Sequence, residues 1–169
     1  MSYTSTSVST YTRTYTATHL ADVILGSIAD ILGTLRLDPT RIFADWDTDQ
    51  RAIAAWIVEG SLKCVALECH QPSGAVTPIF EFPLSYTGTG EGDRKFTADR
   101  AALARYLAKL QSVPSGTSYQ LFCSFNGSHS SQPGWSAANR ASTSGMRSYS
   151  FGTLGSAPHA SASLRYFVK

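Results

Sequence analysis

Charged side chains are scarce in this chain of 169 residues, because Asp, Glu, Lys and Arg together make up 15% of it, well below the usual quarter. Lys and Arg exceed Asp and Glu by only two charges, and the positive residues are scattered. Partners that are recognised by charge alone require clustered Lys and Arg. The sequence therefore predicts neither direct nucleic-acid binding nor membrane binding.

Cysteines and long apolar runs are also few. Cys64, Cys69 and Cys123 are an odd number beside apolar stretches, which argues against a disulfide framework and favours buried thiols in a reducing compartment. No window approaches the roughly 18 apolar residues of a membrane span. Residues 1–18 lack the charged start and apolar stretch of a signal peptide. We therefore expect a soluble, cytoplasmic protein.

What is abundant is hydroxyl side chains, with 40 Ser and Thr residues. The chain is long enough to bury roughly two-thirds of its surface in one core, so we expect a single domain over residues 1–169. Eleven Ser or Thr and three Tyr fall within residues 1–18. This segment has too few aliphatic residues to form a core of its own. We expect it to be flexible, either frayed or held as an edge strand.

Residues 19–126 carry the pattern of a core made of helices and strands. Apolar residues at spacings of three and four predict a helix of about 18 residues that Thr18 caps; these residues are Leu20, Val23, Ile24, Ile28, Ile31, Leu32 and Leu35. Asp38 and Pro39 begin a second helical stretch that Gly60 ends, and the acidic run 47–49 breaks it in two.

From residue 62 onward the apolar side chains recur at every second position, as in a strand. Residues 62–67 and 76–84 predict a hairpin, and Pro78 and Pro83 should make its second strand short or open on one side. A further helix is expected from a cap at Thr97 to Pro114. A strand follows over residues 117–125, with Tyr119, Leu121, Cys123 and Phe125 on one face.

Residues 126–169 combine many Ser and Gly with spaced large side chains, namely Trp135, Met146, Tyr149 and Phe151. The segment ends in an apolar strand over residues 164–168. A long stretch of this composition inside a compact domain is usually functional or disordered. We expect it to dock on the core, in more than one place.

Motifs for catalysis are weak. The run Gly88-x-Gly90-x-Gly92 has the spacing of neither a dinucleotide fingerprint nor a phosphate loop. Ser136 follows Gly134 and Trp135 as in half of a nucleophile elbow, but the preceding segment is polar rather than an apolar strand. The pair Cys123 and His129 lacks a third orienting group. We predict no catalytic residue.

Titratable clusters favour structural roles. The four histidines stand far apart and only Cys69 and His70 adjoin, so no metal site and no cofactor are expected. Asp45, Asp47 and Asp49 are expected to cap a helix and to interact with its dipole. Glu68 and Glu81, on the two hairpin strands, either face each other or face solvent.

The order of the expected elements is that of the HORMA fold: helices, hairpin, helix, strand, then a long C-terminal segment that returns as a strand. The Ser/Thr/Tyr tract that runs into Tyr15-Thr16-Ala17-Thr18-His19 and a long apolar helix resembles the start of bacterial HORMA-domain proteins. These are found beside cGAS-like nucleotidyltransferases in anti-phage (CBASS-type) operons. The resemblance implies an α+β fold, with an antiparallel sheet backed by about three helices.

This resemblance also implies a function. Residues 126–168 would form a safety belt that wraps around a closure-motif peptide or protein, which adds as a strand beside residues 117–125. The implied peptide-binding residues are Tyr119, Leu121, Cys123, Phe125, Trp135, Met146, Tyr149 and Phe151. The closed state would bind and activate the nucleotidyltransferase, with a HORMA paralogue as a further partner.

The resemblance further implies remodelling by an AAA+ ATPase that grips the N-terminal segment, and the engaged residues would be Ser2, Tyr3, Thr4, Ser5 and Thr6. Two other interpretations stay open at this point. One is a small cytoplasmic hydrolase that uses Ser136 or Cys123. The other is a structural protein that associates with itself through its Tyr- and Thr-rich N-terminus.

Overall fold

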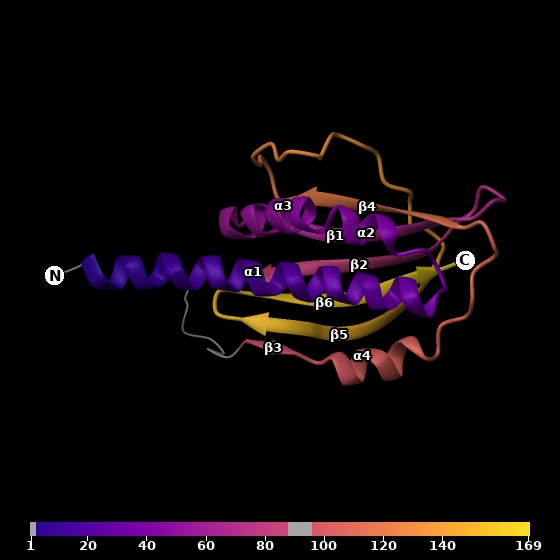
Figure 1. The fold of residues 1–169 in the computed structure, drawn as a ribbon, viewed down its shortest axis with the longest axis horizontal. Helices are drawn as coiled ribbons and strands as arrows, with labels where there is room; N and C mark the ends of the chain where they lie inside the picture. The colour runs from indigo at the N-terminus through magenta and orange to yellow at the C-terminus, as the bar shows by residue number, and fades with distance from the viewer. Residues whose placement is uncertain (1–2, 88–95) are drawn as a thin grey trace.

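The computed structural model describes residues 3–87 and 96–169, with residues 3–11 described as backbone only. The elements are α1 (Tyr3–Thr34), α2 (Thr40–Ala44), α3 (Trp46–Glu59), β1 (Leu62–His70), β2 (Val76–Tyr86), β3 (Thr97–Ala98), α4 (Arg100–Leu107), β4 (Ser118–Phe125), β5 (Arg147–Ala157) and β6 (Ala160–Val168). This is the α+β class that the sequence predicts, with an antiparallel sheet and helices beside it (Figure 1).

The six strands form one sheet in the order β3-β5-β6-β2-β1-β4. The predicted hairpin, β1 with β2, lies in its centre, and its register pairs Leu67 with Phe80. The C-terminal hairpin, β5 with β6, joins this centre through β6, which pairs with β2. On the other side, β4 pairs with β1 and ends the sheet. The C-terminal hairpin and β4 therefore lie on opposite sides of the central hairpin.

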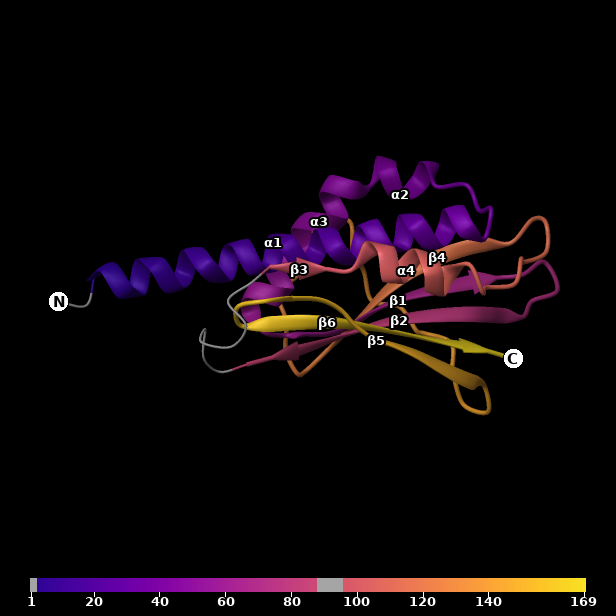
Figure 2. The ribbon, with the colours of Figure 1, turned by 90° about the horizontal axis from the view of Figure 1, so that it is seen from below.

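All four helices of the described chain cover one face of this sheet (Figure 2). The core between the two layers contains fully buried aliphatic and aromatic side chains from α1, α3, β1 and β2; the largest include Leu20, Ile24, Ile28, Ile53, Trp56, Leu67, Phe80 and Phe82. Each such side chain contributes roughly 1.5–3 kcal/mol of hydrophobic free energy. This core fixes the positions of α3 and β1, and so of β4.

Helix α1 begins at Tyr3 and not near Thr18. Its N-terminal half is made of residues with only modest helix penalties, and extending an existing helix is much easier than starting one. Thr16 and Ala17 are buried, and the Thr16 hydroxyl donates a hydrogen bond of 2.5 Å to the carbonyl of Pro158. Tertiary contacts therefore hold the helix well before its aliphatic stripe, and Thr18 is not a cap.

Two other helix boundaries also differ from expectation. The second predicted helical stretch is divided at Asp45, between α2 and α3, and not at residues 47–49. Gly60 ends α3 in the left-handed region, as predicted. Helix α4 is capped by Asp99, whose carboxylate accepts from the Ala102 amide at 2.9 Å. Thr97 lies in β3 instead.

The second hairpin strand is longer than expected. Strand β2 has 11 residues and a neighbour on each side, but its pairing with β6 skips the positions between Glu81 and Leu84. Pro83 has no ladder donor, so the open side predicted there is present. Strand β5 was not expected at all, because its many small and polar residues carry little strand signal.

The three cysteines are free thiols, and Cys64 and Cys69 are buried. Burial raises the pKa of the Cys64 thiol to about 11 and that of Cys69 to about 12. Neither thiol is therefore a nucleophile at neutral pH. None of the helices described here combines the length and apolar character that crossing a bilayer requires.

Candidate functional site

The outer edge of β4 is the starting point for the site. Among the described residues no strand pairs with this edge, since β4 stands last in the sheet beside β1. An unpaired edge presents backbone N–H and C=O groups that can bind another extended chain. On the helix-facing side of β4, Tyr119, Leu121, Cys123 and Phe125 pack against the core, as the predicted alternation requires.

Residues 126–146, called here the wrapping segment, leave the end of β4, pass outside that strand and then reach β5 (Figure 1). The segment is first anchored on α3. The Trp56 indole donates to the Ser130 carbonyl at 2.8 Å, and Glu59 accepts from both the amide and the hydroxyl of Ser130. The His129 ring stacks on Phe125, with 3.6 Å between centroids.

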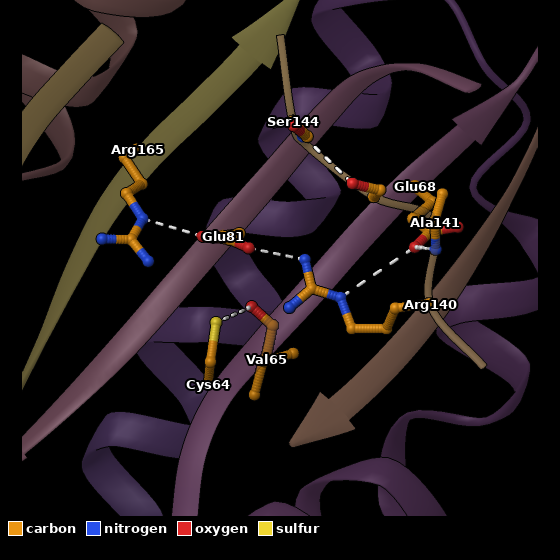
Figure 3. Close-up of polar contacts among 9 residues, drawn as sticks. Cys64, Val65, Glu68, Glu81, Arg140, Ala141, Ser144 and Arg165 are labelled. Carbon is orange, nitrogen blue, oxygen red and sulfur yellow. Dashed lines mark hydrogen bonds and ion pairs between the residues drawn. The ribbon is translucent and has the colours of Figure 1, made fainter. Parts of the chain in front are cut away.

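A second anchor lies on the face of the sheet that is opposite the helices (Figure 3). Arg140 donates to Glu81 of β2 at 2.6 Å, and its Nε lies 4.0 Å from Glu68 of β1. The Ala141 amide donates to Glu68 at 2.8 Å. Arg165 of β6 donates to the other oxygen of Glu81 at 2.7 Å. The wrapping segment is thus fixed to both faces of the sheet, on either side of the β4 edge.

The carboxylates of this second anchor are buried, with Glu68 1% and Glu81 6% exposed. Burial opposes ionisation of Glu81, but the hydrogen bonds and charges of Arg140 and Arg165 outweigh it, so the pKa of Glu81 lies below its usual value. Neither carboxylate faces solvent, and each receives a hydrogen bond. The sequence left open whether Glu68 and Glu81 face each other or face solvent. In the structure both carboxylates instead contact the wrapping segment.

A cavity of about 710 Å³ lies between β4, the wrapping segment and helices α2 and α3. We call it the β4 groove. It is lined by Arg41, Ile42, Asp45, Asp49, Trp56, residues 119–123, Phe125, residues 129–132 and residues 134–138. Its volume is in the range of ligand pockets in general. Its floor includes the helix-facing side chains of β4, so a chain added to the edge would lie within it.

Five of the eight residues expected to bind peptide line this groove: Tyr119, Leu121, Cys123, Phe125 and Trp135. Trp135 packs edge-on against Trp56, with centroids 5.5 Å apart. Its indole Nε1 is buried and has no hydrogen-bond partner among the described residues.

The other three expected residues lie elsewhere. Met146 ends the wrapping segment, and Tyr149 and Phe151 lie in β5, on the far side of the central hairpin. Tyr149 stacks on Tyr166, and Phe151 contacts Tyr106 edge-on. None of the three lines the β4 groove.

The acidic residues near the start of α3 behave differently from the capping expectation. Asp45 occupies the N-cap position without a side-chain hydrogen bond to the helix. Asp45 and Asp49 line the groove, whereas Asp47 does not. Burial, followed by repulsion from Asp45, raises the pKa of Asp49 to about 6. The capping interpretation is therefore wrong for Asp45.

The weak catalytic motifs find no support in the geometry. Burial raises the pKa of Cys123, and His129 faces Phe125 and the Ser130 carbonyl. Ser136 lies in the wrapping segment and not between a strand and a helix. Within the described ranges no three His, Cys, Asp or Glu residues gather as a metal site would require. The glycine run at 88–92 lies outside the described residues.

Of the residues expected to engage an ATPase, one is outside the described part of the chain and four are inside it. Ser2 lies outside the described residues, whereas residues 3–6 form the first turn of α1. This end of α1 extends beyond the sheet in both ribbon views (Figures 1 and 2).

Several groups of the site escape sequence analysis. Trp56 looks like an ordinary core residue by spacing, yet its indole also holds the wrapping segment. Arg140 stands alone in a polar stretch, and only the fold brings it to Glu81. The available signal was the strand position of Glu68 and Glu81, because inward carboxylates in a sheet require cationic or N–H partners.

Comparison with known proteins assigns the fold. The family model described as bacterial HORMA domain 2 matches residues 5–169. No curated protein sequence matches the chain. Solved structures do match, however, at low sequence identity.

A chain of the mitotic checkpoint complex is 8% identical, with a TM-score of 0.73 over 90% of this chain and 98% of that one. C. elegans HTP-2 bound to the HIM-3 closure motif is 13% identical, with a TM-score of 0.68 over 89% and 88%. The E. coli MS115-1 CdnC:HORMA-deltaN complex contains a chain that is 13% identical, with a TM-score of 0.58 over 92% and 88%.

Proposed function

This chain belongs to the bacterial HORMA domain 2 family, and from that premise we propose that it is a peptide-binding signalling switch and not an enzyme. The ligand is a closure-motif peptide that lies in the β4 groove. The observation that carries this proposal is the unpaired edge of β4 beneath the wrapping segment, with a cavity of about 710 Å³ between them.

Binding at this site is strand addition. The backbone of an extended peptide pairs with the outer edge of β4, which supplies affinity for any sequence. Specificity comes from the side chains on the floor and roof of the groove, which include Leu121, Phe125 and Trp135. The buried Trp135 Nε1 lacks an acceptor in the described chain, and a peptide carbonyl or side-chain oxygen supplies one.

The wrapping segment makes the complex slow to dissociate. It is fixed at Ser130 on one side of the β4 edge and at Arg140 on the other, so a bound strand cannot leave sideways while both anchors hold. Release requires at least one anchor to open. Bound and open packings are then the two states of a switch whose populations the peptide shifts.

The downstream partner in this proposal is a cGAS-like nucleotidyltransferase, which the closed state binds and activates in anti-phage defence. The likeness to a chain of the CdnC:HORMA-deltaN complex supports this choice, as the likeness to HTP-2 with its closure motif supports a peptide ligand. An AAA+ ATPase resets the switch by pulling on the N-terminal end of α1. A HORMA paralogue that carries the motif is one source of the peptide.

A peptide-display selection on the purified protein tests the proposed binding, with trypsin cleavage at Arg140 as the readout for each selected peptide. Peptides that share a motif should bind and slow cleavage of the wrapping segment, because a bound strand holds it closed. Selection without enrichment, and cleavage that no peptide slows, would overturn the proposal.

Replacing a groove residue tests the location of binding. Trp135→Ala removes part of the groove lining and should weaken binding of a selected peptide at least about tenfold, the loss expected for a buried aromatic anchor. Tyr149→Ala is the matched control, because Tyr149 is an exposed aromatic outside the groove, and it should bind as the unchanged protein does. Isothermal titration calorimetry measures both. Equal losses in the two variants would place binding elsewhere.

A further inference from the structure

Two carboxylates in the β4 groove have no partner in the described chain. Asp49, partly buried on α3, and Asp45, exposed at its N-cap, both line the groove. Neither forms an ion pair or accepts a side-chain hydrogen bond among the described residues. The buried carboxylates of the sheet, Glu68 and Glu81, have partners in Arg140, Arg165, His70 and a backbone amide.

In the described part of the chain, the surroundings of Asp49 lack a cation that forms an ion pair with its carboxylate. Burial is the largest effect on its carboxyl group, Asp45 adds repulsion, and Arg41 offsets this in part, which leaves a pKa of about 6. Arg41 lines the same groove but forms no ion pair with either carboxylate. The groove therefore carries two carboxylates against one guanidinium, beside an apolar floor at Leu121 and Phe125.

We propose that the peptide held in the β4 groove carries a basic side chain, lysine or arginine, which pairs with Asp49 and Asp45. This inference rests on the proposed function, because it concerns the same groove. A cation placed here donates hydrogen bonds to carboxylates that have no other partner, and charge-assisted bonds of this kind are stronger than neutral ones. An acidic side chain at the same position meets repulsion from both carboxylates.

The recognised motif is therefore an extended segment in which one Lys or Arg has apolar residues two positions away, on the same face of the strand. These apolar residues contact the β4 floor, and an acceptor group near Trp135 satisfies its buried Nε1. The charge acts as a selectivity filter, because the backbone pairing by itself does not distinguish sequences.

Positional-scanning pools of synthetic octapeptides test this inference, with one position fixed in turn as Lys, norleucine or Glu. Norleucine keeps most of the lysine stem without the charge, so it is the neutral control. At one position the Lys pool should bind about tenfold more tightly than the norleucine pool, the gain expected for a hydrogen bond to a charged group. The Glu pool should bind more weakly than both.

The variant Asp49→Asn should bring the Lys and norleucine pools to nearly equal affinity. Asp47→Asn is the matched control, because Asp47 is an exposed acid of the same helix turn that does not line the groove, and it should keep the full preference. The comparison of pools on the unchanged protein does not depend on either variant's folding. Circular dichroism confirms the fold of both variants.

The preference should also depend on pH. Asp49 has to lose its proton before it pairs with the cation, so affinity for the Lys pool should rise from pH 5 to 7 and then level off, whereas the norleucine pool should change little. The other charged or titratable groups of the groove are Asp45, Arg41, Tyr119, Cys123 and His129; burial raises the pKa of Tyr119, so it stays neutral in this range. The thiol of Cys123 stays neutral in this range, and the pH dependence should persist in His129→Gln.

The outcomes separate this inference from the function on which it rests. Pools that bind the groove with no preference for Lys, or with a preference for Glu, overturn the basic-residue inference and leave peptide binding intact. A Lys preference that Asp49→Asn does not reduce places the cation elsewhere and also overturns it. If no pool binds at all, peptide binding itself fails.

Discussion

The pKa values of Glu81 and Asp49 shift in opposite directions, because arginines form ion pairs with Glu81 and none in the described chain forms an ion pair with Asp49. Glu81 is almost fully buried, yet Arg140 and Arg165 lower its pKa. Asp49 is less buried, but no cation pairs with it and its pKa rises to about 6. The same side-chain chemistry therefore fixes the wrapping segment at one place and leaves an open binding position at the other.

The anchor at Arg140 makes a prediction about stability. Arg140→Met leaves Glu81 with only one of its two arginines and Glu68 with only His70 and the Ala141 amide, and we expect the free energy of unfolding at pH 7 to fall by about 3 kcal/mol, the lower end for a broken buried pair. Arg147→Met is the control, because Arg147 is an exposed arginine with no ion pair in the described chain. Urea denaturation measures both.

The pH dependence of this difference has a definite sign. Because the folded-state pKa of Glu81 is lowered, its contribution to stability is complete above the ordinary value of 4.5 and is lost as pH falls through the lower folded value. The gap between Arg140→Met and the unchanged protein should therefore shrink below pH 4.5. A gap that is constant from pH 7 to pH 3 would contradict the ion-pair account.

At the scale of elements, the wrapping segment depends on close backbone contact with α3. Gly134 has a φ of +83°, and a Cβ at this position would lie 2.7 Å from the Cγ2 of Thr48. No rotation of the substituted alanine relieves such a contact, so the Thr48 side chain, the segment or the helix must move. Gly127, with a φ of +90°, stands in the same segment and has open space around it.

This pair of glycines separates backbone strain from steric contact. Both Gly134→Ala and Gly127→Ala cost about 1–2 kcal/mol for the left-handed backbone, but only Gly134→Ala also meets Thr48. We expect Gly134→Ala to speed trypsin cleavage at Arg140 several-fold beyond Gly127→Ala. Adding Thr48→Ser, which deletes the contacting methyl group, should bring the cleavage rate of Gly134→Ala back to that of Gly127→Ala. Equal cleavage of the two single variants would show that Gly134 is not held against α3.

At the scale of the whole molecule, α1 connects the N-terminus to the C-terminal hairpin. Its N-terminal end extends beyond the sheet (Figure 2), while Thr16 is buried and bonded to Pro158 in the turn between β5 and β6. His19 also contacts the carbonyl of Thr97, beside β5. We therefore expect force applied to the N-terminal end of α1 to reach the β5–β6 hairpin through these contacts.

Removing residues 2–12 tests whether the ATPase acts on the N-terminal end of α1, and it leaves these contacts in place. We expect the shortened protein to bind a selected peptide with unchanged affinity, because the groove lies on other elements, but to lose ATP-dependent release by the AAA+ ATPase of the proposed function. Fluorescence anisotropy of a labelled peptide measures both. Undiminished release, with Thr16 and His19 still in place, would contradict the proposal that the ATPase pulls on this end of α1.

The sequence by itself determined the class of the fold, the central hairpin and the alternation of β4, because their apolar periods record which faces are buried. It also indicated that residues 126–169 dock on the core, since spaced aromatics such as Trp135 have little other use in a polar stretch. It misplaced the start of α1, because Ser and Thr oppose a helix only weakly and contacts from Thr16 outweigh them.

Only the tertiary structure decided which distant residues meet. Arg140 reaches Glu81 because the wrapping segment crosses to the open face of the sheet, and Asp49 reaches the groove because α3 packs above β4. No local period encodes either meeting, since each joins elements that are far apart in the chain. The assignment of β5 to the far side of the sheet likewise follows from its pairing with β6, and this pairing leaves the β4 edge free for a partner.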